Sequence, residues 1–104
     1  MEQAMHGEYK TPGGKLVIVD FEVIERHLQK VQVSGDFFLY PDEALDAITG
    51  ALEGMSAELR ETEIARVVSE AIPSGTEVLG TSPEAIAIAV QRAIRDAVEG
   101  PHQT

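Results

Sequence analysis

The chain has 104 residues, of which 43% are hydrophobic, and this length suits one domain with one continuous core. Eighteen acidic residues against eight basic ones give a net charge of −10, which disfavours nucleic acid and anionic membranes as partners. The absence of cysteine excludes disulfides, thiolate zinc sites, iron–sulfur ligation and a cysteine nucleophile. No apolar run approaches the roughly 18 residues of a membrane span, and the N-terminus lacks the pattern of a secretory signal, so we expect a cytoplasmic protein.

The N-terminal part of the chain carries the period of β-strands. Apolar residues alternate from Leu16 to Ile24, and the stretch Gln29–Phe37 repeats this pattern. Because the connection between these stretches is short, they are expected to pair antiparallel. The turn signal Pro12-Gly13-Gly14 folds a further strand, His6–Lys10, back onto the first. The sequence therefore predicts a three-stranded antiparallel meander.

The rest of the chain carries the period of α-helices and predicts three of them. The first opens at Pro41 and stops at Gly54, the second starts between Ser56 and Glu61 and stops at Pro73, and the third is capped by Ser82 and stops at Gly100-Pro101. A short extended piece is expected at Thr76–Leu79. This order predicts an α+β fold with three helices packed on one sheet face.

The domain is expected to span residues 1–104, with its core at about 7–98 and a flexible tail at 99–104. Gly50 lies inside the first predicted helix, where glycine costs about 1 kcal/mol relative to alanine. We therefore expect another element to pack closely at Gly50.

The sequence offers no catalytic constellation. His6, His27 and His102 lie near an end, a turn and a tail, and none has the spacing of a zinc site. There is no G-x-S-x-G elbow, and carboxylates on helix faces are usually solvated. Whether the chain is an enzyme stays open on these grounds, and no catalytic residue, metal site or cofactor of its own is predicted.

The turn between the first two predicted strands does not have the sequence pattern of a phosphate-binding loop. Tyr9 and Leu16 occupy the positions where such a loop needs glycine and serine or threonine, and the turn leads into a strand instead of a helix. Two interpretations stay open: a plain hairpin turn, or a turn that faces an anionic ligand or a partner. The residues of the second interpretation are Lys10, Gly13, Gly14 and Lys15.

The stretch Gly35–Tyr40 contains three of the five aromatic residues, at the seam between sheet and first helix. Alternation cannot bury both Phe37 and Phe38 on one sheet face, so the strand is expected to end there. Either one ring fills the core while the other covers an edge, or an exposed ring anchors a partner. The candidate motif residues at this seam are Gly35, Asp36, Phe37 and Phe38.

These stretches together resemble the C-terminal accessory domain of lipoate–protein ligases. The resemblance spans about residues 7–98, and no single element of it is diagnostic. It rests on Tyr9-Lys10, Pro12-Gly13-Gly14-Lys15-Leu16, Gly35-Asp36-Phe37-Phe38 with Pro41, Leu52-Glu53-Gly54, and Gly80-x-Ser82-Pro83-Glu84 before an alanine-rich helix.

In that family a large domain binds lipoate and ATP and carries the catalytic lysine, and the small domain is fused to it or encoded separately. A chain with its own methionine just before the domain resembles the separate form. The resemblance therefore implies an accessory subunit, needed when a separate catalytic subunit activates lipoate to lipoyl-AMP with ATP. Lipoate, ATP and magnesium are then expected in the partner, and Lys15 is not the family's catalytic lysine. Lipoyl acceptor domains are expected as indirect partners only.

The fold of that family is similar to the SufE/NifU-like fold of sulfur-transfer and iron–sulfur scaffold proteins. Those activities need thiolates, which this chain does not have. The alternative to an accessory subunit is a stand-alone small-molecule-binding or structural module of this fold. A deep pocket lined by Lys15, Asp36 and a histidine would favour a module that acts alone.

Overall fold

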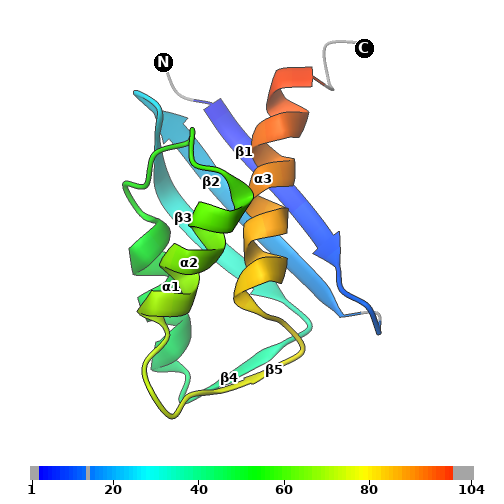
Figure 1. Ribbon diagram of the computed structural model, residues 1–104. Coiled ribbons are helices and arrows are strands. Elements are labelled where there is room, and N and C mark those ends of the chain that lie inside the picture. The colour runs from blue at the N-terminus through cyan, green and yellow to red at the C-terminus, as the bar shows by residue number, and fades with distance from the viewer. Residues whose placement is uncertain (1–2, 14, 100–104) are drawn as a thin grey trace.

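The computed structural model describes residues 3–13 and 15–99, and its centre is a three-stranded antiparallel sheet with helices on one face (Figure 1). The strands are β1 (Gln3–Lys10), β2 (Leu16–Ile24) and β3 (His27–Gly35), in the order β1-β2-β3. A second, two-stranded sheet pairs β4 (Phe38–Tyr40) with β5 (Glu77–Leu79). The helices are α1 (Glu43–Leu52), α2 (Glu61–Ala71) and α3 (Pro83–Glu99).

The predicted α+β order and the meander are confirmed, whereas the β4–β5 sheet was not predicted. The extended piece expected at Thr76–Leu79 forms β5, and β3 ends at Gly35, two residues before the predicted end. Strands of three residues are too short to show an alternating pattern, so their pairing could not be read from the sequence. None of the helices within 3–13 and 15–99 is both long and apolar enough to cross a membrane.

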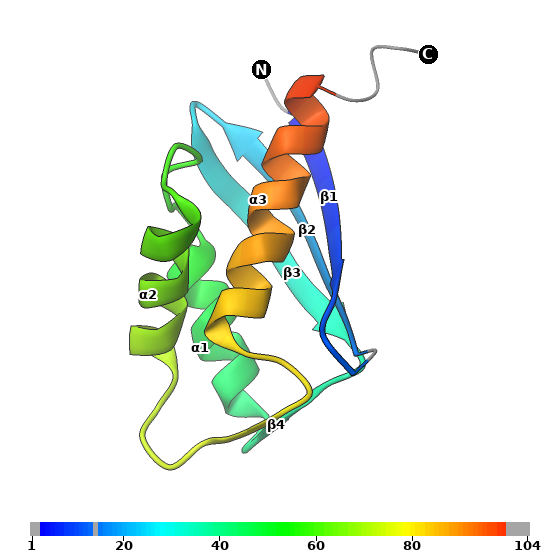
Figure 2. The same cartoon turned by 45° about the vertical axis from the view of Figure 1, so that its right-hand side comes forward.

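The helices form a layer on the inner face of the β1–β3 sheet, and they differ in which strands or helices they contact. Helix α3 lies along β1 and β2, and α1 lies against β3, whereas α2 contacts α1 and α3 (Figure 2). Alternation in β2 places Val17, Val19 and Phe21 in the core between these layers. The same core contains Ile48 and Leu52 of α1, Ile64 and Val68 of α2, and Ile86, Ala89 and Val90 of α3. Burial of each large side chain stabilises the fold by about 1.5–3 kcal/mol.

The helix ends follow most of the predicted punctuation. The Ser82 hydroxyl accepts a hydrogen bond from the Ala85 backbone N–H at 3.0 Å, which is the expected cap of α3. Gly54 has φ +78° just beyond α1, as its predicted stop requires. Pro41 lies before the N-cap residue Asp42 and not in the first turn of α1, so that detail was wrong. Glu99, predicted to start the tail, ends α3, and residues 100–104 lie outside the described part of the chain.

The C-terminal end of α1 is hydrogen-bonded to β3 at an irregularity of the sheet. The register between β2 and β3 shifts between Asp20 and Glu22, and Lys30 opposite has φ +56°. The Glu53 carboxylate accepts hydrogen bonds from the backbone N–H groups of Lys30, at 3.2 Å, and Val31, at 2.7 Å. A side chain just after the helix thus satisfies two donors at the bulge, which joins α1 to the sheet.

Gly7 in β1, and not Gly50, is the glycine at which two elements pack closely. A Cβ atom built on Gly7 would collide with the Ala89 carbonyl oxygen and lie 2.7 Å from the Ala93 nitrogen, so α3 lies directly on the strand. The close packing expected at Gly50 was wrong, since a Cβ atom there would meet nothing within 4 Å.

We expect Gly7→Ala to lower the free energy of unfolding by about 2–3 kcal/mol, because the added methyl group must push α3 off the sheet. The matched variant Gly50→Ala adds the same methyl group in open space inside a helix, and it is expected to raise stability by up to about 1 kcal/mol. Urea unfolding followed by circular dichroism measures both. Equal stabilities of Gly7→Ala and the unmodified chain would contradict the close approach.

Candidate functional site

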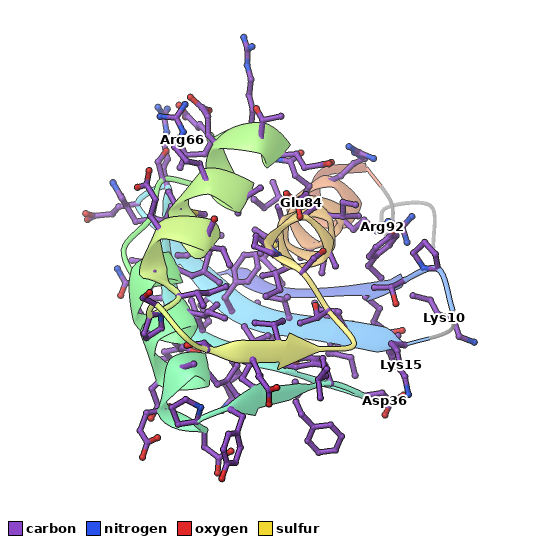
Figure 3. The ribbon with its side chains drawn as sticks, turned by 60° about the horizontal axis from the view of Figure 1, so that its bottom comes forward. Lys10, Lys15, Asp36, Arg66, Glu84 and Arg92 are labelled. Carbon is purple, nitrogen blue, oxygen red and sulfur yellow. The ribbon has the colours of Figure 1, made fainter. Side chains whose placement is uncertain are left out.

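Three segments that are distant in sequence meet at one end of the β1–β3 sheet. Gly35, the last residue of β3, is paired with Val17, and the Asp36 backbone N–H donates a hydrogen bond to the Leu16 carbonyl oxygen at 2.9 Å. Gly80, before α3, lies directly against the backbone of Asp36. The glycine–lysine turn, the Gly35–Phe38 seam and the start of α3 are therefore neighbours. Figure 3 shows Lys10, Lys15 and Asp36 on the same side of this end.

Glycine at positions 35 and 80 is explained by backbone packing. Gly35 has φ +143°, and a Cβ atom there would collide with the Leu16 carbonyl oxygen. Gly80 has φ +90°, and its Cβ atom would lie 3.0 Å from the Asp36 carbonyl oxygen. Both conformations strain any other residue, and both spaces are closed to a side chain. These glycines hold the three segments together.

The turn between β1 and β2 is closed by Thr11, a residue that the sequence did not single out. Its backbone N–H and its hydroxyl both donate to the Lys15 carbonyl oxygen, at 2.7 and 3.0 Å. Gly13 has φ +98°, as a tight turn requires, and Gly14 lies outside the described residues. Lys10 and Lys15 are exposed at the two ends of this turn. The turn therefore presents two ammonium groups on a closed backbone loop.

A cavity of about 300 Å³ lies between the turn and the start of α3. The turn contributes Tyr9, Thr11, Pro12 and Lys15, and the other side contributes Gly80, Thr81, Ser82, Glu84, Ala85 and Ile88. The Thr81 hydroxyl is buried and has no hydrogen-bond partner among the described residues. Sequence reasoning quoted Gly80-x-Ser82 only as a helix start, because nothing in a linear motif shows which distant turn a helix start faces.

The cavity does not have the lining expected of a module that acts alone. Lys15 lines it, whereas Asp36 lines a separate hollow beside Glu8, Lys10, Leu16 and Arg92. No histidine lines either hollow within the described part of the chain. The arrangement that would favour the stand-alone alternative is therefore not formed by these residues.

The seam residues separate into a packed ring and an exposed ring. Phe37 is half-buried and packs against the core, whereas Phe38 lies on β4 with 74% of its surface exposed. The strand ends at Gly35, two residues before the predicted end at Phe37, and the chain changes sheets at this point. This geometry leaves both interpretations of the seam open, so the anchoring of a partner by the exposed ring stays a prediction.

Arg92 of α3 links the helix to the strand that precedes the turn. Its guanidinium carbon lies 5.1 Å from the centroid of the Tyr9 ring, and its Nη1 donates to the Glu8 carbonyl oxygen at 3.3 Å. A cation over an aromatic face contributes about 0.5–1 kcal/mol at an exposed site. This contact adds to the packing at Gly7 in fixing α3 beside the turn.

A histidine between two carboxylates lies on the outer face of the sheet, away from the helices. His6 Nδ1 is 2.6 Å from the Asp20 carboxylate, and its Nε2 is 2.8 Å from the Glu8 carboxylate. The hydrogen bonds to Glu8 and then Asp20 raise the pKa of His6 above 6.5. Among the described side chains, those of 4–13 and 15–95, no three of His, Asp or Glu are arranged to hold a metal ion. The sequence did not reveal this cluster because His6 and Asp20 meet only through strand pairing.

The fold is similar to that of a chain in a solved structure. That structure is described as an archaeal lipoylation system, a bi-partite lipoate protein ligase and its E2 lipoyl domain from Thermoplasma acidophilum. The TM-score is 0.64 with 22% sequence identity, and the match covers 86% of this chain and 94% of that chain. The chain thus resembles a component of a bipartite lipoate protein ligase system, which confirms the resemblance at the level of the fold. No protein-family model and no curated protein matches the chain.

We expect NMR titration to give a pKa of His6 above 6.5, and Glu8→Gln to lower it more than Asp20→Asn does. Because the pKa is raised in the folded state, the contribution to stability is full below about pH 6.5 and is lost as the pH rises through the folded value. The pairs are exposed, so this contribution is at most about 1 kcal/mol. A pKa of His6 that neither variant changes would contradict the geometry.

Proposed function

We propose that the chain is the accessory subunit of a lipoate–protein ligase, needed when a separate catalytic subunit activates lipoate to lipoyl-AMP with ATP. The observation that carries this proposal is the structural match to a chain of a bi-partite ligase system. Because the match covers 94% of that chain, the similar chain is itself a small domain of about this size. A bipartite ligase has a second component, so we infer a catalytic partner for this chain.

The groups gathered at one end of the sheet suit binding and positioning. Lys15, the closed backbone of the turn and the start of α3 line a cavity of about 300 Å³, and Lys10 lies at the other end of the turn beside a separate hollow. Ammonium groups and backbone N–H groups at a helix start attract negative charge. Lys10, Gly13, Gly14 and Lys15 are therefore proposed as the part that faces the partner or its anionic ligand.

Docking on the catalytic subunit would assist the first reaction step in two physical ways. A domain that covers the lipoate and ATP site keeps water from the reactive mixed anhydride. It also orders the loops that hold ATP, which brings the reacting groups into position. Lipoate, ATP and magnesium would bind in the partner, and the transfer of preformed lipoyl-AMP would not need this chain.

We expect addition of the chain to raise lipoate-dependent ATP–pyrophosphate exchange by a catalytic subunit from the same organism. Changing Lys10 and Lys15 together to alanine is expected to reduce this stimulation by roughly tenfold, because charge-assisted hydrogen bonds contribute about 1.5–3 kcal/mol. Lys30→Ala is the matched control, since Lys30 lies on the outer sheet face near Glu22. It is expected to leave the stimulation unchanged.

Exchange that is the same with and without the chain would end the proposal. A rise in the melting temperature of the catalytic subunit with unchanged adenylation would instead support the structural module. Turnover of lipoate and ATP by the purified chain alone would favour the stand-alone alternative.

A further inference from the structure

The solvent-facing side of the small β4–β5 sheet is apolar. Phe38, Tyr40 and Leu79 are 74%, 70% and 60% exposed, and they are the exposed large hydrophobic residues of the described chain. Clusters of exposed large apolar side chains mark interaction sites in soluble proteins. We call these three residues the aromatic face.

Strand pairing explains why these side chains lie on one surface. Phe38 is directly opposite Leu79 in the antiparallel register, and Tyr40 is opposite Glu77. Paired residues share a face, and so do residues two apart in a strand. The intervening residue Leu39 is buried on the other side, against the core. The aromatic face is therefore an ordered surface on a strand pair whose inner side is fixed by packing.

Exposed apolar side chains on the outer side do not help to attach the small sheet to the core. A two-stranded pair of this length is marginal alone, and its inner contacts through Leu39 and Val78 would suffice to attach it to the core. Polar residues on the outer side would leave those contacts intact. Exposed aromatic rings are enriched at the centres of protein interfaces, where they supply much of the binding energy.

The charged side chains in the chain segments that carry and flank β4 and β5 are acidic, and the lysines at this end of the molecule belong to the turn, Lys10 and Lys15. Residues 31–59 and 67–91 contain no lysine, arginine or histidine. Their acidic side chains that flank β4 and β5 are Asp36, Asp42, Glu43, Asp46 and Glu77, and all five are exposed. A second copy of this chain would bring like charges together, which disfavours self-association through this face. A surface complementary to this face would be an apolar depression edged by lysine or arginine.

We propose that the aromatic face is the surface by which this chain docks on the catalytic subunit, a role that rests on the function proposed above. Its rings would fill an apolar depression of that subunit, and the surrounding carboxylates would pair with basic residues at the edge. The β4–β5 sheet and the turn with Lys10 and Lys15 lie at the same end of the molecule (Figure 3). Docking through the aromatic face therefore carries the lysine turn towards the partner, and binding and activation have separate residues.

Isothermal titration calorimetry of the chain with a catalytic subunit from the same organism tests this assignment. The double variant Phe38→Ser with Leu79→Ser is expected to weaken binding about tenfold or more, because the apolar contact at the interface centre is lost. Both residues are exposed, so thermal melting of the free variant is expected to match the unmodified chain. The lysine-turn variant, Lys10→Ala with Lys15→Ala, is expected to stimulate exchange poorly.

Reversing the charge of acidic residues beside the aromatic face is a second, independent test of the docking surface. Asp42→Lys with Glu77→Lys is expected to weaken binding, and added salt is expected to weaken the binding of the unmodified chain. Glu25→Lys with Glu70→Lys makes the same change of net charge away from β4 and β5, and it is expected to bind normally.

The outcomes separate this inference from the proposed function. In one outcome, the unmodified chain binds and stimulates the catalytic subunit, and the Phe38/Leu79 variant binds with the same affinity as the unmodified chain. The aromatic face is then not the docking surface, and the proposed function stands. If the unmodified chain neither binds nor stimulates, the proposed function fails and the docking assignment fails with it. Loss of binding in the Phe38/Leu79 and Asp42/Glu77 variants alone supports the assignment.

Discussion

The direct contact of α3 with β1 at Gly7 sets how closely α3 lies to the sheet. With no Cβ atom at Gly7, the backbone at Ala89 and Ala93 rests on the strand. Two residues further along β1, Tyr9 holds the Arg92 guanidinium and lines the cavity at the turn. Because a helix is rigid along its length, this one contact sets how closely its first residues approach the turn between β1 and β2. The distance between turn and helix start is thus a consequence of core packing.

At the candidate site, two further glycines also allow backbone segments to pack in direct contact. Gly35 lies against the carbonyl of Leu16, and Gly80 lies against the backbone of Asp36, so three chain segments are held together without intervening side chains. The motif that resembled an accessory domain therefore has a structural component. Gly35, Gly80 and the Glu53 carboxylate of this motif stabilise the scaffold, whereas Lys10, Lys15 and Phe38 are exposed. Function is expected from the exposed members of the motif.

The sequence predicted the parts of the fold that local periodicity encodes. Alternation in β2 and β3 and the helical stripes of α1–α3 are burial patterns within single segments, so they can be read without knowing the tertiary structure. Pairing of β4 with β5 joins two three-residue segments separated by α1 and α2, and no periodicity reports it. The cavity at Thr81 and the His6 cluster could not be predicted for the same reason, since each is formed by segments that are distant in sequence. Close packing was predicted at Gly50, where it is absent, and was not predicted at Gly7, where it occurs. A sequence shows that a glycine has no side chain, but not whether another element lies in the space that a side chain would take.

The account's central claim is that the end of the molecule formed by the turn, the seam and the start of α3 meets the catalytic subunit. Hydrogen–deuterium exchange of the chain with and without that subunit tests it most directly, since amides covered at an interface exchange more slowly. Slower exchange on binding is predicted in segments 8–13, 35–42 and 77–84, with α2 and the outer face near His6 unchanged. Protection confined to α2 or to the outer sheet face would contradict the account.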